Sequence, residues 1–231
     1  MERGDWIDTS TCCNRAAPRC GDADIWWFAL LPGDGDEALL DAGERRRAAR
    51  FVRGVDRMRY VAAHAWTRRI LATYIDAAAA ALRFVPDGAG KPRLEGGRLH
   101  FNLSHSAGYA LIAVCADREL GVDIEAWREV DEALADAVLA PGERAELARG
   151  GLDAPRLLQC WTHKEAFLKA LGCGLHRDPR SVDVGLGAAR RRMVDGVEMR
   201  ALPLPAGYSG ALAVVGGCRS VRLLQLHGGR H

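Results

Sequence analysis

The sequence predicts an α+β fold in which a unit made of a long helix and short antiparallel strands occurs twice. A weak internal repeat is the first observation, since three short motifs recur in the same order. They are Gly43-Glu44-Arg45, Trp66-Thr67 and Ala107-Gly108-Tyr109, followed by Gly142-Glu143-Arg144, Trp161-Thr162 and Ala206-Gly207-Tyr208. Short apolar runs that resemble strands are the second: residues 109–115 in the first half, and 210–215 and 221–226 in the second. We expect a pseudo-twofold duplication of two similar subdomains, each a helix packed on a small antiparallel sheet.

The elements follow in chain order. Residues 25–31 (IWWFALL) predict a buried first strand, and residues 43–69, dense in arginine with interspersed apolar residues, predict one or two amphipathic helices. The basic face of these helices is either solvated or a phosphate-binding edge. We expect a boundary near Trp127, with residues 1–126 as an N-terminal subdomain and residues 127–231 as a C-terminal one.

Composition limits the function. The 231 residues are 48% hydrophobic and 27% charged, which predicts a globular, soluble protein, and no apolar run reaches the roughly 20 residues of a membrane helix. We expect a cytoplasmic location. A net charge of +2 is too small to indicate nucleic-acid binding. Seven cysteines, including the adjacent Cys12 and Cys13 and lacking CxxC spacing, indicate reduced thiols.

Two carboxylates mark a candidate metal site. Residues 109–115, a polar turn and residues 120–125 predict a hairpin, and alternation along its second strand puts Asp123 and Glu125 on one face. Gly121 allows close approach of another element. Paired carboxylates repel each other unless a cation lies between them, and oxygen ligands suit Mg²⁺. The alternative is the solvent-exposed face of an edge strand.

A helix is predicted from Pro155 to Leu171, ended by Gly172 and Gly174. Lys164 falls within its apolar stripe, so its amine must reach solvent or find an anion between packed elements. Glu165 and Lys169 lie one turn apart, which fits either an ordinary surface pair or a phosphoryl-transfer site.

Lysine is rare in this chain. Only three of the 32 basic residues are lysines, namely Lys91, Lys164 and Lys169. Because an ammonium is a compact point charge whose proton can move, its retention suggests close phosphate contact or proton transfer.

The segment FNLSHS at residues 101–106 contains a serine and a histidine side by side. Ser104 and His105 face opposite ways on extended backbone, so they cannot form a nucleophile and base pair. In a turn after a strand they suit contact with a phosphate or an adenine edge, or they simply stabilise that turn.

Three motifs together carry a resemblance. FNLSHS at 101–106, GVDIE at 121–125 and WTHKEAFLKALGCGL at 161–175 resemble, in order and separation, the 4'-phosphopantetheinyl transferases of the surfactin type. The resemblance implies a pseudo-dimer of two α+β halves with the active site in the cleft between them. It also implies transfer of the phosphopantetheine arm of coenzyme A to a serine of an apo acyl or peptidyl carrier protein, with release of adenosine 3',5'-bisphosphate.

The resemblance further implies roles for individual residues. Glu165 and Lys169 would be catalytic, and Asp123, Glu125 and Glu165 would bind Mg²⁺. Coenzyme A would be bound by Arg47, Arg59, Lys91, Pro92, Ser104, His105 and Lys164.

The sequence also raises expectations about the protein partner and leaves two other functions possible. We expect a monomer that serves secondary metabolism and meets its carrier through an arginine-rimmed apolar patch in residues 144–156. Two rival functions stay open: a Mg²⁺-dependent phosphohydrolase acting on the pyrophosphate of coenzyme A, and a non-catalytic coenzyme A binding module.

Overall fold

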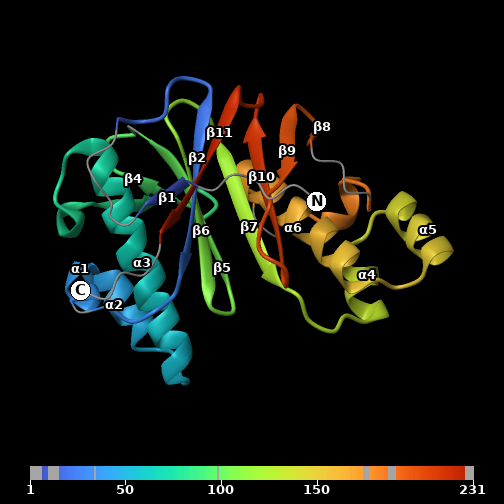
Figure 1. The fold of residues 1–231 in the computed structure, drawn as a ribbon, viewed down its shortest axis with the longest axis horizontal. Helices are drawn as coiled ribbons and strands as arrows, with labels where there is room; N and C mark the ends of the chain where they lie inside the picture. The colour runs from blue at the N-terminus through green and yellow to red at the C-terminus, as the bar shows by residue number, and fades with distance from the viewer. Residues whose placement is uncertain are drawn as a thin grey trace.

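Two β-sheets pack against each other between two long helices (Figure 1). The computed structural model describes residues 7–9, 16–33, 35–97, 99–173, 177–186 and 191–226. Cys12, Cys13 and Gly174, which entered the sequence predictions, lie outside these residues.

The first sheet has five strands in the order β1 (Ile7–Thr9), β11 (Ser220–Leu226), β2 (Asp22–Ala29), β6 (Tyr109–Cys115) and β5 (His100–Ser106). The second has four, in the order β7 (Leu120–Ala126), β10 (Tyr208–Val215), β9 (Val197–Ala201) and β8 (Arg191–Val194). A small separate pair joins β3 (Phe84–Pro86) to β4 (Pro92–Leu94).

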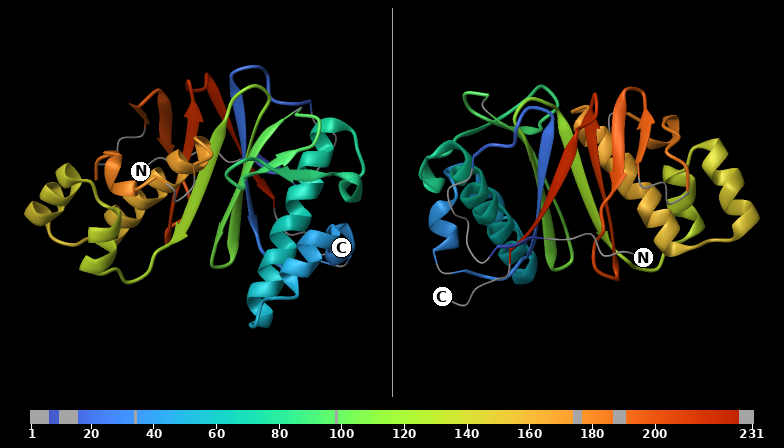
Figure 2. Two further views of the ribbon diagram at one scale, coloured as in Figure 1. Left: turned by 180° about the vertical axis from the view of Figure 1, so that it is seen from behind. Right: turned by 45° about the horizontal axis from the view of Figure 1, so that its top comes forward.

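The helices lie outside the sheets. The long ones are α3 (Gly54–Ile75) and α6 (Ala154–Ala170), on opposite outer sides of the paired sheets (Figure 2). The shorter ones are α1 (Asp36–Leu39), α2 (Ala42–Ala48), α4 (Glu132–Val138) and α5 (Pro141–Gly150), with 3₁₀ turns η1 (Ala79–Ala81) and η3 (Pro179–Ser181). In the described part of the chain, no helix is long and apolar enough to cross a membrane.

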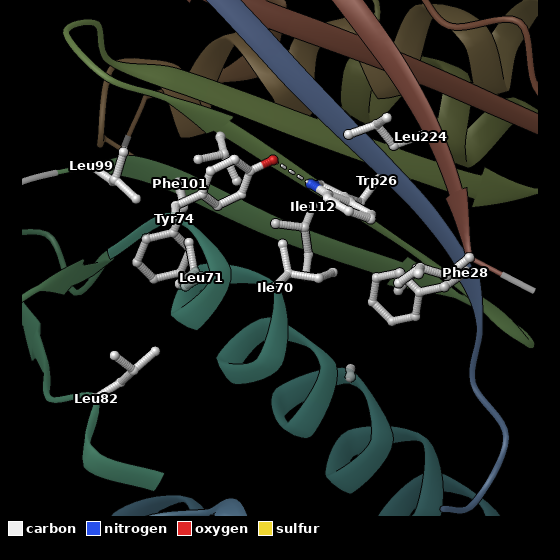
Figure 3. Packing of buried hydrophobic residues seen from close by; sticks show 14 of the residues in the cluster. Trp26, Phe28, Ile70, Leu71, Tyr74, Leu82, Leu99, Phe101, Ile112 and Leu224 are labelled. Carbon is white, nitrogen blue, oxygen red and sulfur yellow. Dashed lines mark hydrogen bonds between the residues drawn. The ribbon is translucent and has the colours of Figure 1, made fainter. Parts of the chain in front are cut away.

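Three apolar clusters hold these layers together. One lies between α3 and the first sheet, where Trp26 and Phe28 pack against Ile70 and Leu71 (Figure 3). Within it the indole N–H of Trp26 donates to the hydroxyl of Tyr74 at 2.7 Å, so the polar edge of the ring is satisfied in the core. Equivalent clusters lie between α6 and the second sheet, and between the two sheets.

The predicted fold class is confirmed. Two helix–sheet units, α3 on the first sheet and α6 on the second, agree with a pseudo-twofold duplication. The strand predicted at 25–31 is β2, the basic helices predicted in 43–69 are α2 and α3, and the helix predicted at 155–171 is α6.

The predicted hairpin of residues 109–115 and 120–125 is wrong. Strand β6 pairs with β2 and β5, whereas β7 pairs with β10 in the other sheet. The turn between β6 and β7 therefore carries the chain from one sheet to the other. Side chains of β5 hold β7 beside it, because the backbone N–H of Val122 donates to Asn102 Oδ1 at 2.8 Å.

Two further expectations differ from the structure. Residues 221–226 were predicted in the second half, but β11 joins the first sheet and runs parallel to β2, so this sheet is mixed. Arg222 fixes that pairing with two hydrogen bonds, at 2.6 and 2.8 Å, to the buried carboxylate of Asp24. Ser104, His105 and Ser106 belong to strand β5 itself and not to a turn after it.

Candidate active site

The candidate site lies where β7 passes under α6. Gly121 makes this approach possible, because a Cβ atom at this position would lie 2.1 Å from the carbonyl oxygen of Ala166 and 2.5 Å from the amide nitrogen of Ala170. Any side chain here would push the helix away from the strand. The contact brings Asp123 on β7 close to Lys169 on α6.

Asp123 is the most constrained carboxylate of this group. It is 5% exposed, and its Oδ1 accepts hydrogen bonds from Ser104 Oγ at 2.7 Å and from Lys169 Nζ at 2.6 Å. Among the described residues, its Oδ2 is the one buried side-chain nitrogen or oxygen that has no hydrogen-bond partner. A buried unpaired carboxylate oxygen is costly, and a cation is the partner that best satisfies it.

Two more carboxylates face the same place. Burial raises the pKa of Glu165, and the negative charges of Asp123 and Glu125 raise it further, against the opposing effect of Lys169. Glu125 accepts a hydrogen bond from Ser106 Oγ at 3.1 Å. The residues predicted to hold Mg²⁺ are therefore electrostatically coupled.

The donor set fits a hard divalent cation, since it consists of carboxylate oxygens. The carboxylates are not close enough together to coordinate one ion as they stand. Within the described ranges, no three His, Cys, Asp or Glu side chains are grouped so that they could hold a metal ion. Here the ammonium of Lys169 partly neutralises the carboxylates.

Strand β5 connects this group to α3. Its even-numbered side chains, Ser104 and Ser106, face β7, whereas Leu103 packs in the cluster under α3. His105 alternates with the serines, and its pKa is lowered by desolvation and then by the nearby basic groups His64, Lys169 and Arg59. Basic side chains from α3 and α6 therefore lie close to His105, beside the carboxylates.

Two basic residues predicted to bind coenzyme A, Arg47 and Arg59, lie on α2 and α3. The guanidinium of Arg47 lies over the ring of Tyr60, 5.9 Å from its centroid. Arg59 is 3.9 Å from Asp56 and about one third exposed, so it retains a free surface for an anion.

Lys164 does not join this group. Its side chain is fully buried, and its ammonium bonds Glu143 Oε2 at 2.6 Å and the carbonyl oxygens of Val182 at 2.6 Å and Pro179 at 2.9 Å. The anion that the sequence pattern required for this lysine is thus Glu143. Its predicted contact with coenzyme A gains no support from this position.

Lys91 also turns inward. Its ammonium donates to the carbonyl oxygens of Leu120 at 2.7 Å and Lys169 at 2.9 Å, and to Glu119 Oε2 at 3.2 Å. The neighbouring Pro92 is exposed at the start of β4. A contact between the Lys91 ammonium and a nucleotide stays a prediction.

Sequence reasoning missed several residues that build the site. Ser106 and Asn102 tie β5 to β7, and the two-residue spacing of Ser104 and Ser106, which matches that of Asp123 and Glu125, was a usable signal. His64, bonded to Glu44 at 2.9 Å, gave no such signal, because only the packing of α3 brings it near His105.

A family model matches the part of the chain that contains the candidate site. Residues 119–206, which contain Asp123, Glu125, Glu165 and Lys169, match the model of the 4'-phosphopantetheinyl transferase superfamily.

Individual relatives are similar over a longer stretch. A putative 4'-phosphopantetheinyl transferase, slr0495, from Synechocystis is 35% identical over 63% of this chain and 61% of the relative. The 4'-phosphopantetheinyl transferase HetI from Nostoc is 38% identical over 60% of this chain and 62% of the relative, and the 4'-phosphopantetheinyl transferase ffp from Bacillus subtilis is 27% identical over 60% and 62%. The chain thus spans about three fifths of the length of these relatives.

Proposed function

We propose that this chain, whose residues 119–206 match the model of the 4'-phosphopantetheinyl transferase superfamily, transfers the 4'-phosphopantetheine arm of coenzyme A to a serine of an apo acyl or peptidyl carrier protein. One observation carries the proposal: at the contact of β7 with α6, the buried Asp123 bonds Lys169 and keeps one oxygen without a hydrogen-bond partner, with the carboxylates of Glu125 and Glu165 near enough to influence each other.

In the proposed reaction the serine oxygen of the carrier bonds to the phosphorus that bears the pantetheine arm. The bond from that phosphorus to the oxygen bridging to the nucleotide breaks, and adenosine 3',5'-bisphosphate leaves. Glu165 would accept the serine proton, since its partly buried carboxylate faces the group and its raised pKa favours holding a proton. Lys169 would stabilise negative charge that develops on the phosphoryl oxygens.

Asp123, Glu125 and Glu165 would hold Mg²⁺. When bound, the ion supplies Lewis-acid activation of the attacked phosphorus and a template for the pyrophosphate. The unpaired Oδ2 of Asp123 supports this assignment. Ser104 would orient Asp123 through its 2.7 Å hydrogen bond, and His105 with Arg59 and Arg47 would bind the phosphates of coenzyme A.

The carrier would approach from the side of α4 and α5. An open depression of about 500 Å³ lies there, and its lining residues are Leu139, Pro141, Arg144, Arg180, Asp136, Asp178 and Ser181. Arg144 already pairs with Glu132 and Asp136, and Arg156 with Glu146, so an acidic carrier helix would compete with these exposed partners. We propose that the enzyme acts as a monomer on carriers of secondary metabolism.

The test incubates the purified protein with coenzyme A, Mg²⁺ and an apo carrier, and weighs the carrier by mass spectrometry. A transferase adds the mass of one phosphopantetheine. A phosphohydrolase would cleave coenzyme A without any carrier, and a binding module would leave both reactants unchanged. Either result would refute the proposal, and a panel of apo carriers would identify the preferred class.

Glu165→Ala tests the assigned base and ligand. We expect this variant to lose transfer by at least about a thousandfold, because it removes both a metal ligand and the proton acceptor, while coenzyme A still binds. Turnover is measured by mass spectrometry and binding by calorimetry. Turnover close to that of the wild type would remove Glu165 from the mechanism.

A further inference from the structure

Lys91 makes an unusual set of contacts for a residue outside both helix–sheet cores. It follows a tight turn in which Asp87 Oδ1 accepts hydrogen bonds from the amides of Ala89 at 3.0 Å and Lys91 at 2.9 Å. Arg93 donates to the other oxygen of the same carboxylate at 3.0 Å. The backbone that carries Lys91 is therefore fixed before its side chain leaves the turn.

The side chain then reaches the two elements that carry the candidate site. Its ammonium bonds the carbonyl oxygen of Leu120, next to Gly121 on β7, and that of Lys169, in the last turn of α6. The Lys169 carbonyl also accepts a hydrogen bond from the amide of Gly172 at 3.2 Å, so the ammonium bonds the second lone pair of this oxygen. A cation at this end of α6 also suits the helix dipole. The side chain is 8% exposed, so these bonds are shielded from water.

We infer that Lys91 is a positioning residue that fixes the end of α6 against the start of β7, and so sets how Glu165 and Lys169 face Asp123 and Glu125. An ammonium has three N–H groups, and three acceptors converge on this one when Glu119 is included. A guanidinium is longer and planar, so an arginine at position 91 would need the turn, β7 or α6 to shift before its N–H groups could reach the same three acceptors.

The inference rests on the proposed function only for its kinetic test. Lys91→Met keeps the apolar stem and removes all three hydrogen bonds. We expect kcat for transfer to fall about tenfold or more, while KM for coenzyme A changes less than about twofold, because the site is misaligned and not deprived of a ligand contact. A rise in KM at unchanged kcat would mean that the ammonium contacts coenzyme A, and would overturn the inference.

Amide hydrogen exchange gives a readout that needs no activity. In Lys91→Met we expect amides in residues 120–124 and 168–173 to exchange about tenfold faster, with the rest of the chain unchanged. Arg83→Met is the control, because Arg83 is an exposed basic residue that lies before β3 and outside the Asp87 turn; it should leave both segments at wild-type rates. Faster exchange throughout Lys91→Met would indicate general destabilisation and refute a local role.

The outcomes also separate the two proposals. If the wild type transfers nothing, the proposed function fails and hydrogen exchange alone decides the role of Lys91. If Lys91→Met does not fold, Lys91→Arg takes its place, since it keeps the charge but replaces the compact ammonium with a longer, planar group. Wild-type exchange and kcat in Lys91→Arg would then overturn the inference.

Discussion

Each of the three lysines uses its ammonium in the same way. Lys91, Lys164 and Lys169 each direct it at three oxygen acceptors, which for Lys169 are Asp123 Oδ1, Ser104 Oγ and the carbonyl of Val122. The sequence prediction that lysine marks phosphate contact or proton transfer is therefore too narrow. All three lysines donate to protein carbonyl oxygens, and among them Lys169 is the one that bonds Asp123 of the candidate site.

At the residue scale, the charged carboxylate of Glu165 is expected to destabilise the folded protein. Its carboxylate is partly buried and lies near two others, and both effects raise its pKa. With Mg²⁺ removed by a chelator at neutral pH, we expect Glu165→Gln to raise the melting temperature by up to about 5 °C, because it removes a destabilising charge.

The melting temperature is measured by calorimetry on the protein in the presence of the chelator. Glu129→Gln, at an exposed position, is the control and should change the melting temperature by no more than about 2 °C. A lower melting temperature for Glu165→Gln would mean that the charge is stabilised by Lys169 and not destabilised by its neighbours.

At the element scale, the contact of β7 with α6 depends on Gly121. Gly121→Ala would place its Cβ within 2.1 Å of the helix backbone, so one of the two elements must move. We expect it to lower the free energy of unfolding by about 3 kcal/mol and to reduce transfer, since the metal ligands on β7 and α6 separate.

Urea denaturation measures the change. Gly54→Ala is the control, because no atom lies within 4 Å of the added Cβ in the first turn of α3, and the protein should keep or gain up to about 1 kcal/mol. Equal stabilities for the two variants would show that β7 and α6 can move apart freely.

At the scale of the whole molecule, the duplication extends to buried ion pairs. Glu44 and Glu143 each accept a hydrogen bond from the residue that caps their own short helix, and each binds a fully buried cation on a long helix, Arg68 or Lys164. Each cation also donates to two carbonyl oxygens at a following 3₁₀ turn, η1 or η3. The repeated Gly-Glu-Arg motif of the sequence therefore marks equivalent structural positions.

Because the two buried ion pairs are equivalent, we expect that breaking either one lowers the free energy of unfolding by a similar amount. Arg68→Met and Lys164→Met should each lower the free energy of unfolding by about 3 to 5 kcal/mol, because each leaves a carboxylate and two carbonyl groups without their cation. Arg156→Met, which breaks an exposed pair, should cost less than about 1 kcal/mol. Chemical denaturation compares the three, and a small effect in only one half would show that the pairs are not equivalent.

Local patterns in the sequence predicted the long helices, the strands β2, β6, β7, β10 and β11, and the carboxylates at the site. The reason is that the spacing of apolar residues reports which face of an element is buried, and that D-x-E on a strand places both acids on one face. His64 was not predictable in this way, since it lies in no local pattern that distinguishes it.

By itself the sequence determined the α+β class and the twofold repeat, and it predicted Asp123, Glu125, Glu165 and Lys169 as site residues. Only the tertiary structure decided that β7 leaves the first sheet, that β11 joins it, and where the ammonium groups of Lys91 and Lys164 bind. Side chains alternate between the two faces of a strand in the same way whichever strand lies beside it, so the sequence pattern does not reveal which strands pair. The acceptors of a lysine, such as the carbonyl 78 residues beyond Lys91, are likewise chosen by packing between distant segments.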